Sequence, residues 1–294
     1  MMSTPAELSS GKGHRDENFP VASWIIHPRH RAIILSFYRF ARAADDIADH
    51  PSASPQEKLD LLDRMQRSLL GQSETVPQSA SLRAMLAAHR LSLDHPLDLL
   101  EAFRRDVTKL RYRDWDDLID YCRVSAMPVG RFVLDVHGES RGTWPASDAL
   151  CSALQIINHL QDCGRDYRNL DRVYIPLGAL KERGIGPEAL GAPRASPALL
   201  AVIADLARQT SELLLRAKPF ARQIRDRRLA LEVSVIQALA EDLACGLVRR
   251  DPLCERVHHR KSDVARLAIF AAARFIGGGF RSRLNAPEIA EKRR

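Results

Sequence analysis

One run of charged residues in an apolar background, FYRFARAADDIADH at positions 37–50, most constrains how this chain can fold. On a helix that turns about 100° per residue, Asp45 and Asp49 lie about 40° apart, with Arg42 one turn earlier on the same side. Carboxylates along an otherwise apolar helix are costly to bury unless something pairs them. The run therefore predicts a helix whose acidic stripe is solvated, is paired with Arg42, or binds hard divalent cations through oxygen.

A second polar stripe occurs in LQIINHLQDCGRDY at positions 154–167. Asn158, Asp162 and Asp166 recur every four residues, so they drift only about 80° around a helix, and Gln155 falls within the same arc. One such side chain on a helix is usually at the surface. Four in register on a helix whose other residues are mostly apolar indicate a site, and two stripes of this kind can face each other across a cavity.

Two facing carboxylate walls suit one ligand chemistry in particular. Mg²⁺ prefers octahedral oxygen coordination and commonly binds through a few carboxylates together with a substrate phosphate, so two walls can clamp a diphosphate through bridging ions. The ions and Arg42 would neutralise charge on the leaving group as a C–O bond ionises. An apolar cavity between helices would hold a hydrocarbon and shield a carbocation from water.

The rest of the chain favours an all-α fold, with helices packed around a central site. Period-2 alternation is essentially absent, and apolar residues recur at helical spacing. We expect Ser147 to cap one helix and Met127-Pro128 to kink another. The expected helices span 29–49, 56–70, 82–89, 97–110, 116–136, 147–167, 198–224, 228–248 and 262–275. We expect one domain at 19–276, between a polar, flexible N-terminus at 1–18 and a basic tail at 277–294.

Charge and cysteine content indicate the cellular compartment of the protein and the classes of partner it could bind. The five cysteines show no metal-ligand spacing and indicate reduced thiols in a cytosolic protein. No secretory signal and no apolar run of the ~20 residues needed to span a bilayer is present. The net charge of +7 resides entirely in residues 249–294, which could attract an anionic membrane or nucleic acid, or simply be solvated. No motif supports nucleic-acid binding. We expect a cytoplasmic protein. The segment 264–275 is either a core helix or an interfacial helix that makes peripheral contact with a membrane.

Four segments, in order and spacing, resemble the squalene/phytoene synthase family. They are Arg42-Ala-Ala-Asp45-Asp46-Ile-Ala-Asp49, Tyr121-Cys122 with Ala126-x-x-Val129-Gly130, Gln155-x-x-Asn158-x-x-x-Asp162-x-x-x-Asp166, and Arg172-Val-Tyr174-Ile-Pro176. Either acidic motif alone would be moderate support. The four together cover residues 19–176, and beyond them the match is mostly a helical pattern.

The resemblance implies an isoprenoid-synthase helical fold with a prenyl diphosphate substrate. It implies an Mg²⁺–diphosphate set of Asp45, Asp49, Asn158, Asp162 and Asp166. It implies that further residues orient the diphosphate or shape the cavity, namely Arg42, Tyr121, Gln155, Arg172 and Tyr174. Core packing is nearly as good an explanation for the two tyrosines. Arg39 either joins the phosphate site or is solvated, and Asp46 points away from the stripe.

Departures from the family pattern resemble a bacterial subgroup, the hydroxysqualene synthases of hopanoid biosynthesis. The usual L-R-D-x-x-E-D is changed at Gln161 and Arg165, the segment ENFPVAS stands at 17–23, and Met127 replaces an Asn of the subgroup. The subgroup implies conversion of presqualene diphosphate and water to hydroxysqualene and diphosphate. It needs no nicotinamide cofactor, and it implies coupling to a presqualene diphosphate synthase and an oxidoreductase. The alternatives are head-to-head condensation of two farnesyl or geranylgeranyl diphosphates, and a non-catalytic helical scaffold.

Overall fold

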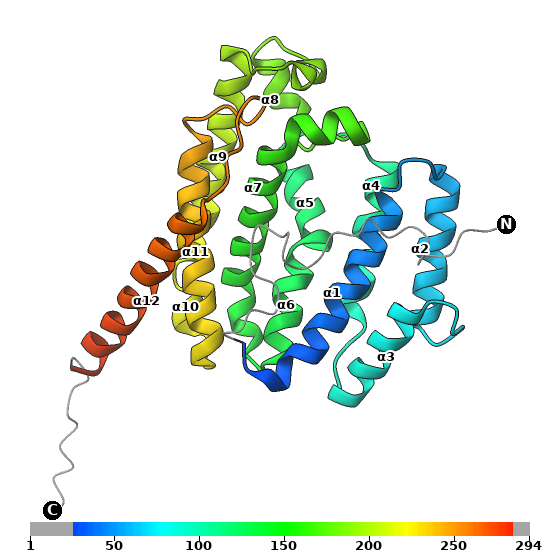
Figure 1. Cartoon of the computed structure of the whole chain (residues 1–294), viewed down its shortest axis with the longest axis vertical. Helices are drawn as coiled ribbons and strands as arrows, with labels where there is room; N and C mark the ends of the chain where they lie inside the picture. The colour runs from blue at the N-terminus through cyan, green and yellow to red at the C-terminus, as the bar shows by residue number, and fades with distance from the viewer. Residues whose placement is uncertain (1–25, 285–294) are drawn as a thin grey trace, which may run out of the picture.

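The computed structural model describes residues 26–284, and its regular structure there is helical. Helices α1 and α7 lie near the middle of the molecule, and the others pack around them (Figure 1). An isolated parallel bridge between Arg111 and Val173 is the β-pairing seen in this range. The α-helices are α1 (Pro28–Ala48), α2 (Pro55–Leu69), α3 (Pro77–His89), α4 (Asp94–Thr108), α5 (Trp115–Ser125), α6 (Met127–Val136), α7 (Trp144–Leu170), α8 (Leu177–Glu182), α9 (Pro197–Ala217), α10 (Phe220–Gln223), α11 (Arg227–Leu247) and α12 (Lys261–Leu284). Short 3₁₀ turns are η2 (Arg141–Thr143) and η3 (Pro187–Gly191).

Two apolar cores divide the helices into two groups. One core lies among α1, α2, α3 and α4, and the other surrounds α7 with α5, α9 and α11. Phe132 of α6 belongs to the first core, where its ring stacks on Phe37 of α1 with 3.9 Å between the centroids. Helices α1 and α7 therefore belong to different cores.

The all-α prediction is confirmed, and most predicted helices agree with the structure to within a few residues. Proline occupies the first turn of α1, α2, α3 and α9, where its missing N–H leaves no helical bond unmade. Ser54 and Glu57 form a reciprocal cap at the start of α2. These local signals explain why the helix starts could be predicted from the sequence.

Some predicted boundaries were wrong. Ser147 is not a cap, because α7 begins earlier, at Trp144, and buries Ser147 completely. The segment 116–136 is two helices that meet at Ala126, just before Pro128, and Pro219 likewise separates α10 from α9. Helix α12 continues through the glycines at 277–279 to Leu284, although the prediction placed its end at 275. The predictions for residues 1–25 and 285–294 lie outside the described residues.

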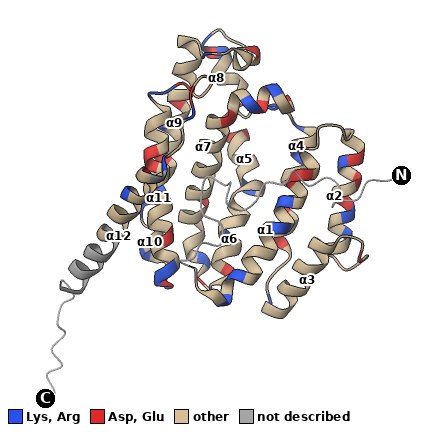
Figure 2. Ribbon diagram, in the orientation of Figure 1, with Lys and Arg blue, Asp and Glu red and all other residues tan. Residues whose placement is uncertain are grey.

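Close packing of α6 on α7 explains why glycine stands at position 130. A Cβ atom at Gly130 would lie 2.5 Å from both Ser147 Oγ and Cys151 Sγ. Helix α7 carries no charged residue between Asp148 and Asp162 (Figure 2). The acidic residues that follow Gln161 are therefore confined to its C-terminal end. Over residues 26–284, no helix is long and apolar enough to cross a bilayer.

Candidate active site

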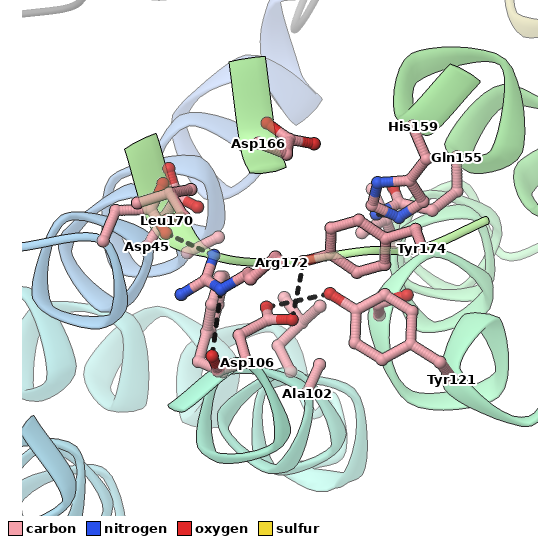
Figure 3. Close-up of a pocket in the computed structure, with 16 residues that line it drawn as sticks. Asp45, Ala102, Asp106, Tyr121, Gln155, His159, Asp166, Leu170, Arg172 and Tyr174 are labelled. Carbon is pink, nitrogen blue, oxygen red and sulfur yellow. Dashed lines mark hydrogen bonds and ion pairs between the residues drawn. The ribbon is translucent and has the colours of Figure 1, made fainter. Parts of the chain in front are cut away.

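A cavity of about 280 Å³ opens where α1, α4, α5 and α7 approach one another (Figure 3). Its wall also includes the extended segment that follows α7. Seven residues predicted from the sequence line it: Asp45, Asp49, Tyr121, Gln155, Asp166, Arg172 and Tyr174. The remaining lining residues are Ala41, Leu99, Ala102, Phe103, Asp106, Ser125, Val129, His159 and Leu170. The structure thus brings residues 41–49 and 155–174 to one cavity, as the two stripes predicted.

The α1 wall is organised by an arginine on the same helix. Arg42 lies 2.8 Å from the carboxylate of Asp45 and 2.8 Å from that of Asp46. Asp46 is buried and does not line the cavity, whereas Asp45 and Asp49 do. The internal Arg–Asp pair considered as an alternative is therefore present, and it coexists with a cavity-facing stripe. Arg39 is exposed and outside the cavity lining.

Arg172 fixes the end of α1 to α4. Its guanidinium donates to Asp49 Oδ1 at 2.6 Å, to the carbonyl of Ala48 at 3.0 Å and to the carbonyl of Asp106 at 2.9 Å. The Arg172 side chain is only 8% exposed. Its planar set of donors satisfies acceptors on two helices at once, which an ammonium group cannot do in the same way. Arg172 therefore positions Asp49 at the cavity edge.

The α7 wall is held less firmly. Asp166 lines the cavity, but Asp162, one turn earlier, pairs with Arg165 at 2.6 Å. Arg165 is 59% exposed, so this pair contributes little to stability. Asn158 is partly buried and does not line the cavity. Of the predicted α7 ligand set, the structure places only Asp166 directly on the cavity.

The carboxylates of the two walls repel one another. Burial and the nearby carboxylate of Asp49 raise the pKa of Asp45 to about 7, against the opposing effect of Arg42. Burial and Asp162 raise the pKa of Asp166 to about 7, with Asp49 adding to the effect across the cavity. Both shifts arise first from burial and then from neighbouring carboxylates, and a bound cation would favour the ionised form of each group. The donor set, oxygen only and on two helices, fits Mg²⁺.

Sequence reasoning missed two groups in the cavity wall. Asp106 of α4 accepts hydrogen bonds from the hydroxyl groups of Tyr121 and Tyr174, each at 2.8 Å. Burial raises the pKa of Asp106 to about 6, although Arg172 and the two tyrosines oppose the shift. A signal was available, because Asp106 follows Leu99 and Ala102 at i+7 and i+4 on the buried face of α4.

The other missed group is His159, which lies inside the second motif between two of its polar residues. Its ring stacks on Tyr174 with 3.5 Å between centroids, and its Nε2 is 2.9 Å from Gln155 Nε2. Burial, reinforced by Arg172, lowers the pKa of His159 to about 3. The imidazole is therefore neutral near pH 7, and it presents a flat aromatic surface together with Tyr174.

The departures from the family pattern have structural roles of their own. Gln161 is buried and donates through its amide to the carbonyl of Val257, which joins α7 to the segment before α12. Arg165 neutralises Asp162, as described above. Met127 opens α6 and lines a separate cavity of about 440 Å³, with α5, α7 and α9 residues around it. Arg165 replaces a glutamate of the family pattern, whereas Asp162 and Asp166 of the motif are retained.

Residues 13–263 match the family described as squalene/phytoene synthase. A hydroxysqualene synthase of Rhodopseudomonas palustris is 60% identical over 87% of this chain and 88% of its own length. A hydroxysqualene synthase of Zymomonas mobilis is 54% identical over 91% of each chain.

Solved structures agree with the sequence relatives. A squalene synthase from Alicyclobacillus acidocaldarius superposes with a TM-score of 0.70 at 32% identity, covering 83% of this chain and 92% of that one. A dehydrosqualene synthase superposes with a TM-score of 0.77 at 19% identity, covering 93% of this chain and 96% of that one, which supports the isoprenoid-synthase helical fold. With a family match over most of its length and relatives more than half identical along nearly the whole chain, this protein belongs to the squalene/phytoene synthase family.

Proposed function

We propose that this enzyme is a Mg²⁺-dependent carbon–oxygen lyase that converts presqualene diphosphate and water to hydroxysqualene and diphosphate. The observation that carries the proposal is the convergence of Asp45 and Asp49 on α1 with Asp166 on α7 at one cavity. Relatives named hydroxysqualene synthase, up to 60% identical over most of their length, support the choice of reaction.

The first step is departure of the diphosphate. The C–O bond of the substrate breaks, and its electron pair leaves with the diphosphate. Mg²⁺ bound to Asp45, Asp49 and Asp166 would supply the positive charge that stabilises this leaving group. Asp162 would join the set when Arg165 turns towards the diphosphate or solvent. Arg172 holds Asp49 in place, and Arg42 holds Asp45.

The second step is capture of the carbocation. The cyclopropylcarbinyl cation rearranges, its ring opens, and water adds to it with release of one proton. Tyr174 and the neutral ring of His159 lie stacked at the cavity wall, so they can stabilise positive carbon through their ring faces. Leu99, Phe103 and Val129 provide the apolar part of the lining for the hydrocarbon. The overall reaction transfers no hydride and needs no nicotinamide cofactor.

The alternative function is condensation of two prenyl diphosphates in the same cavity. It is favoured by one specific observation, the similarity to a solved protein named squalene synthase at 32% identity. The two functions differ in the substrate that the enzyme accepts. They share the carboxylate walls, so substitution of an aspartate alone does not separate them.

A substrate comparison tests the proposal. Purified enzyme is supplied separately with presqualene diphosphate, farnesyl diphosphate or geranylgeranyl diphosphate, each with Mg²⁺ or with EDTA, and the products are identified by mass spectrometry. We expect hydroxysqualene from presqualene diphosphate with Mg²⁺ only. Product from farnesyl or geranylgeranyl diphosphate alone would support the transferase instead. Failure to form any product would favour the scaffold hypothesis, which requires that Asp45→Asn with Asp162→Asn leave the biological role intact.

We further propose peripheral contact with the cytoplasmic membrane, because the substrate and product are both strongly apolar. On α12, Val264, Ile269 and Phe270 are exposed, and Ile269 is 71% accessible. Exposed Arg266 lies among them, as in helices that lie at a lipid interface. Flotation with anionic liposomes, with and without residues 277–294, tests this contact. An upstream presqualene diphosphate synthase and a downstream oxidoreductase would complete the route to squalene.

A further inference from the structure

Three ligand-type side chains from three separate elements meet far from the carboxylate cavity. His30 lies in the first turn of α1, His137 directly follows α6, and Asp226 directly precedes α11. One candidate ligand atom from each residue lies within 4.8 Å of the other two. His30 and Asp45 are 15 residues apart on one helix, so this cluster is about 22 Å along α1 from the cavity. In Figure 1 the start of α1 lies at the lower end of the molecule, beside the end of α6.

We propose that His30, His137 and Asp226 bind a divalent transition-metal ion of the Zn²⁺ class. Two imidazole nitrogens and one carboxylate oxygen suit Zn²⁺ and similar ions, whereas Mg²⁺ prefers oxygen ligands alone. Three protein ligands leave further coordination positions for water. The site goes beyond the proposed reaction, because none of its residues lines the carboxylate cavity.

His137 is already oriented for this role. Its Nδ1 lies 2.8 Å from the carbonyl oxygen of Val133, which can only accept, so Nδ1 carries the proton. The lone pair is therefore on Nε2. A metal-binding histidine commonly donates its other N–H to a backbone carbonyl in this way, because the bond fixes both tautomer and ring orientation.

The backbone at Asp226 is hydrogen-bonded to the segment that carries His137. The carboxylate of Glu139, two residues after His137, accepts from the backbone N–H of Arg225 at 3.0–3.1 Å and from that of Asp226 at 2.8 Å. The Glu139 side chain is only 2% exposed. Asp226 Oδ1 accepts from the first turn of α11, at 2.9 Å from Arg228 N and 3.1 Å from Leu229 N. These bonds all use Oδ1, so Oδ2 can serve as the ligand.

His30 completes the cluster from the other core. It is buried, and its ring centroid is 4.2 Å from that of His137, with 41° between the ring planes. Exposed Arg29 donates through Nε to His30 Nε2 at 2.9 Å, so this nitrogen carries a lone pair. A metal bound through it replaces the guanidinium group. Burial, with His137 nearby, lowers the pKa of His30 to about 4, which keeps the ring neutral and able to coordinate.

A bound ion would link the helices of one apolar core to those of the other. Helix α1 belongs to the core of α1–α4, whereas the chain at Asp226 leads into α11 and the core around α7. The ion would therefore stabilise the folded protein without touching the carboxylates at the far end of α1. This separation allows a test that does not depend on activity.

The test compares Zn²⁺ binding to the metal-stripped full chain and to matched variants, by calorimetry in excess Mg²⁺. The excess Mg²⁺ is added to compete with Zn²⁺ for the carboxylate cavity. His137→Gln removes one ligand, and Asp226→Asn keeps an oxygen for the α11 cap while removing the charge. His259→Gln is the control, since His259 contacts Asp242 at 3.0 Å and belongs to neither the cluster nor the cavity lining. We expect the unmodified chain and the control to bind one more Zn²⁺ than either variant, and Zn²⁺ to raise their melting temperature more.

Absorption of the Co²⁺-loaded unmodified chain provides a second measurement that needs no variant. Nitrogen and oxygen ligands give d–d bands without the thiolate charge-transfer band that exposed Cys245 and Cys254 would produce. The proposal is overturned if His137→Gln and Asp226→Asn, folded by circular dichroism, bind as much Zn²⁺ as the unmodified chain. It is equally overturned if Co²⁺ shows only thiolate ligation. Loss of product formation in the substrate comparison would leave this result unchanged, so the two proposals fail independently.

Discussion

The two acidic helices both place an arginine among their carboxylates, but they hold it differently. On α1, the Arg42 side chain is 20% exposed and lies 2.8 Å from each of two carboxylates, while Arg172 fixes Asp49 from outside the helix. On α7, Arg165 pairs with Asp162 alone and extends into solvent. The α1 wall is therefore a preorganised surface, and the α7 wall is one whose charge can be rearranged by rotation of a single exposed side chain.

The comparison teaches that burial of the paired arginine, rather than the motif, decides how firmly a carboxylate is held. The two motifs are equally clear in the sequence, yet α1 contributes two carboxylates to the cavity lining and α7 contributes one. A buried ion pair is costly to break because the surviving partner is left uncompensated, whereas an exposed pair exchanges readily with water. The predictions below test this difference.

The largest effect is expected from loss of a cavity carboxylate on either wall. Asp45→Asn and Asp166→Asn should each lower kcat/KM for presqualene diphosphate roughly 10²–10³-fold, because each removes charge stabilisation from the leaving group. Steady-state kinetics with saturating Mg²⁺ provides the measurement. Asp171→Asn is a matched control, since Asp171 lies outside the cavity and its left-handed backbone tolerates asparagine. Equal losses in the control would contradict the assignment.

The second prediction compares Arg172, which pairs with Asp49 and is buried, with Arg165, which pairs with Asp162 and is exposed. Arg172→Lys should lower the free energy of unfolding by about 2–4 kcal/mol, because a lysine leaves buried acceptors on α1 and α4 unpaired. Arg165→Lys should change it by less than about 0.5 kcal/mol, because that pair is exposed. Urea denaturation of both variants provides the measurement. Similar losses for the two would remove the distinction between the walls.

The third prediction concerns pH. The pKa values of Asp45 and Asp166 are raised to about 7, so in metal-free protein these groups keep protons that the unfolded chain has already lost. Their contribution to stability is therefore present below about pH 4 and is lost as pH rises towards 7. Because the lowered pKa values of His30 and His159 act in the opposite direction, we expect the melting temperature in EDTA to fall across this range relative to that of Asp166→Asn, by roughly 2–4 °C per kcal/mol lost.

Two additions sharpen the pH experiment. Asp166→Asn should flatten the dependence in EDTA, and Mg²⁺ should raise the melting temperature most above pH 7, where both carboxylates are ionised. In Asp171→Asn, the slope of melting temperature against pH should equal that of the unmodified chain. A melting temperature that rises between pH 4 and 7, after correction by the Asp166→Asn variant, would contradict a raised pKa for Asp166 in the folded protein.

The smallest effect is expected at Arg165 during catalysis. Arg165→Ala frees Asp162 from its pair, and should lower the Mg²⁺ concentration for half-maximal activity by up to roughly 5-fold, the range set by an exposed ion pair. Activity measured against Mg²⁺ concentration tests this, with Arg168→Ala on the same helix as the control. A higher Mg²⁺ requirement would instead indicate that Arg165 binds the substrate diphosphate directly.

Much of the fold could be predicted because its signals are local. Proline in the first turn, capping residues and helical spacing of apolar residues act within a few positions of each other, so α1, α2 and α11 were predicted closely. The prediction for Ser147 failed for the opposite reason. A serine near a helix start suits a cap, but close packing against Gly130 of α6 buries it inside α7.

Site residues could be predicted from the sequence where a motif places several of them on one helix face. Asp45, Asp49 and Asp166 are such residues, and they line the cavity. Asp106 was missed because it stands alone in its segment, and its role exists only through Tyr121 and Tyr174, which come from two other parts of the chain.

The amino-acid sequence by itself determined the helical class, the family and the two acidic stripes, because helical periodicity depends on residues only three or four positions apart. The tertiary structure alone decided which members of those stripes face the cavity, and which arginine braces them. It also brought together His30, His137 and Asp226, the first and last of which are 196 positions apart in the sequence. Such contacts depend on how the two cores pack against each other, and no local pattern encodes that packing.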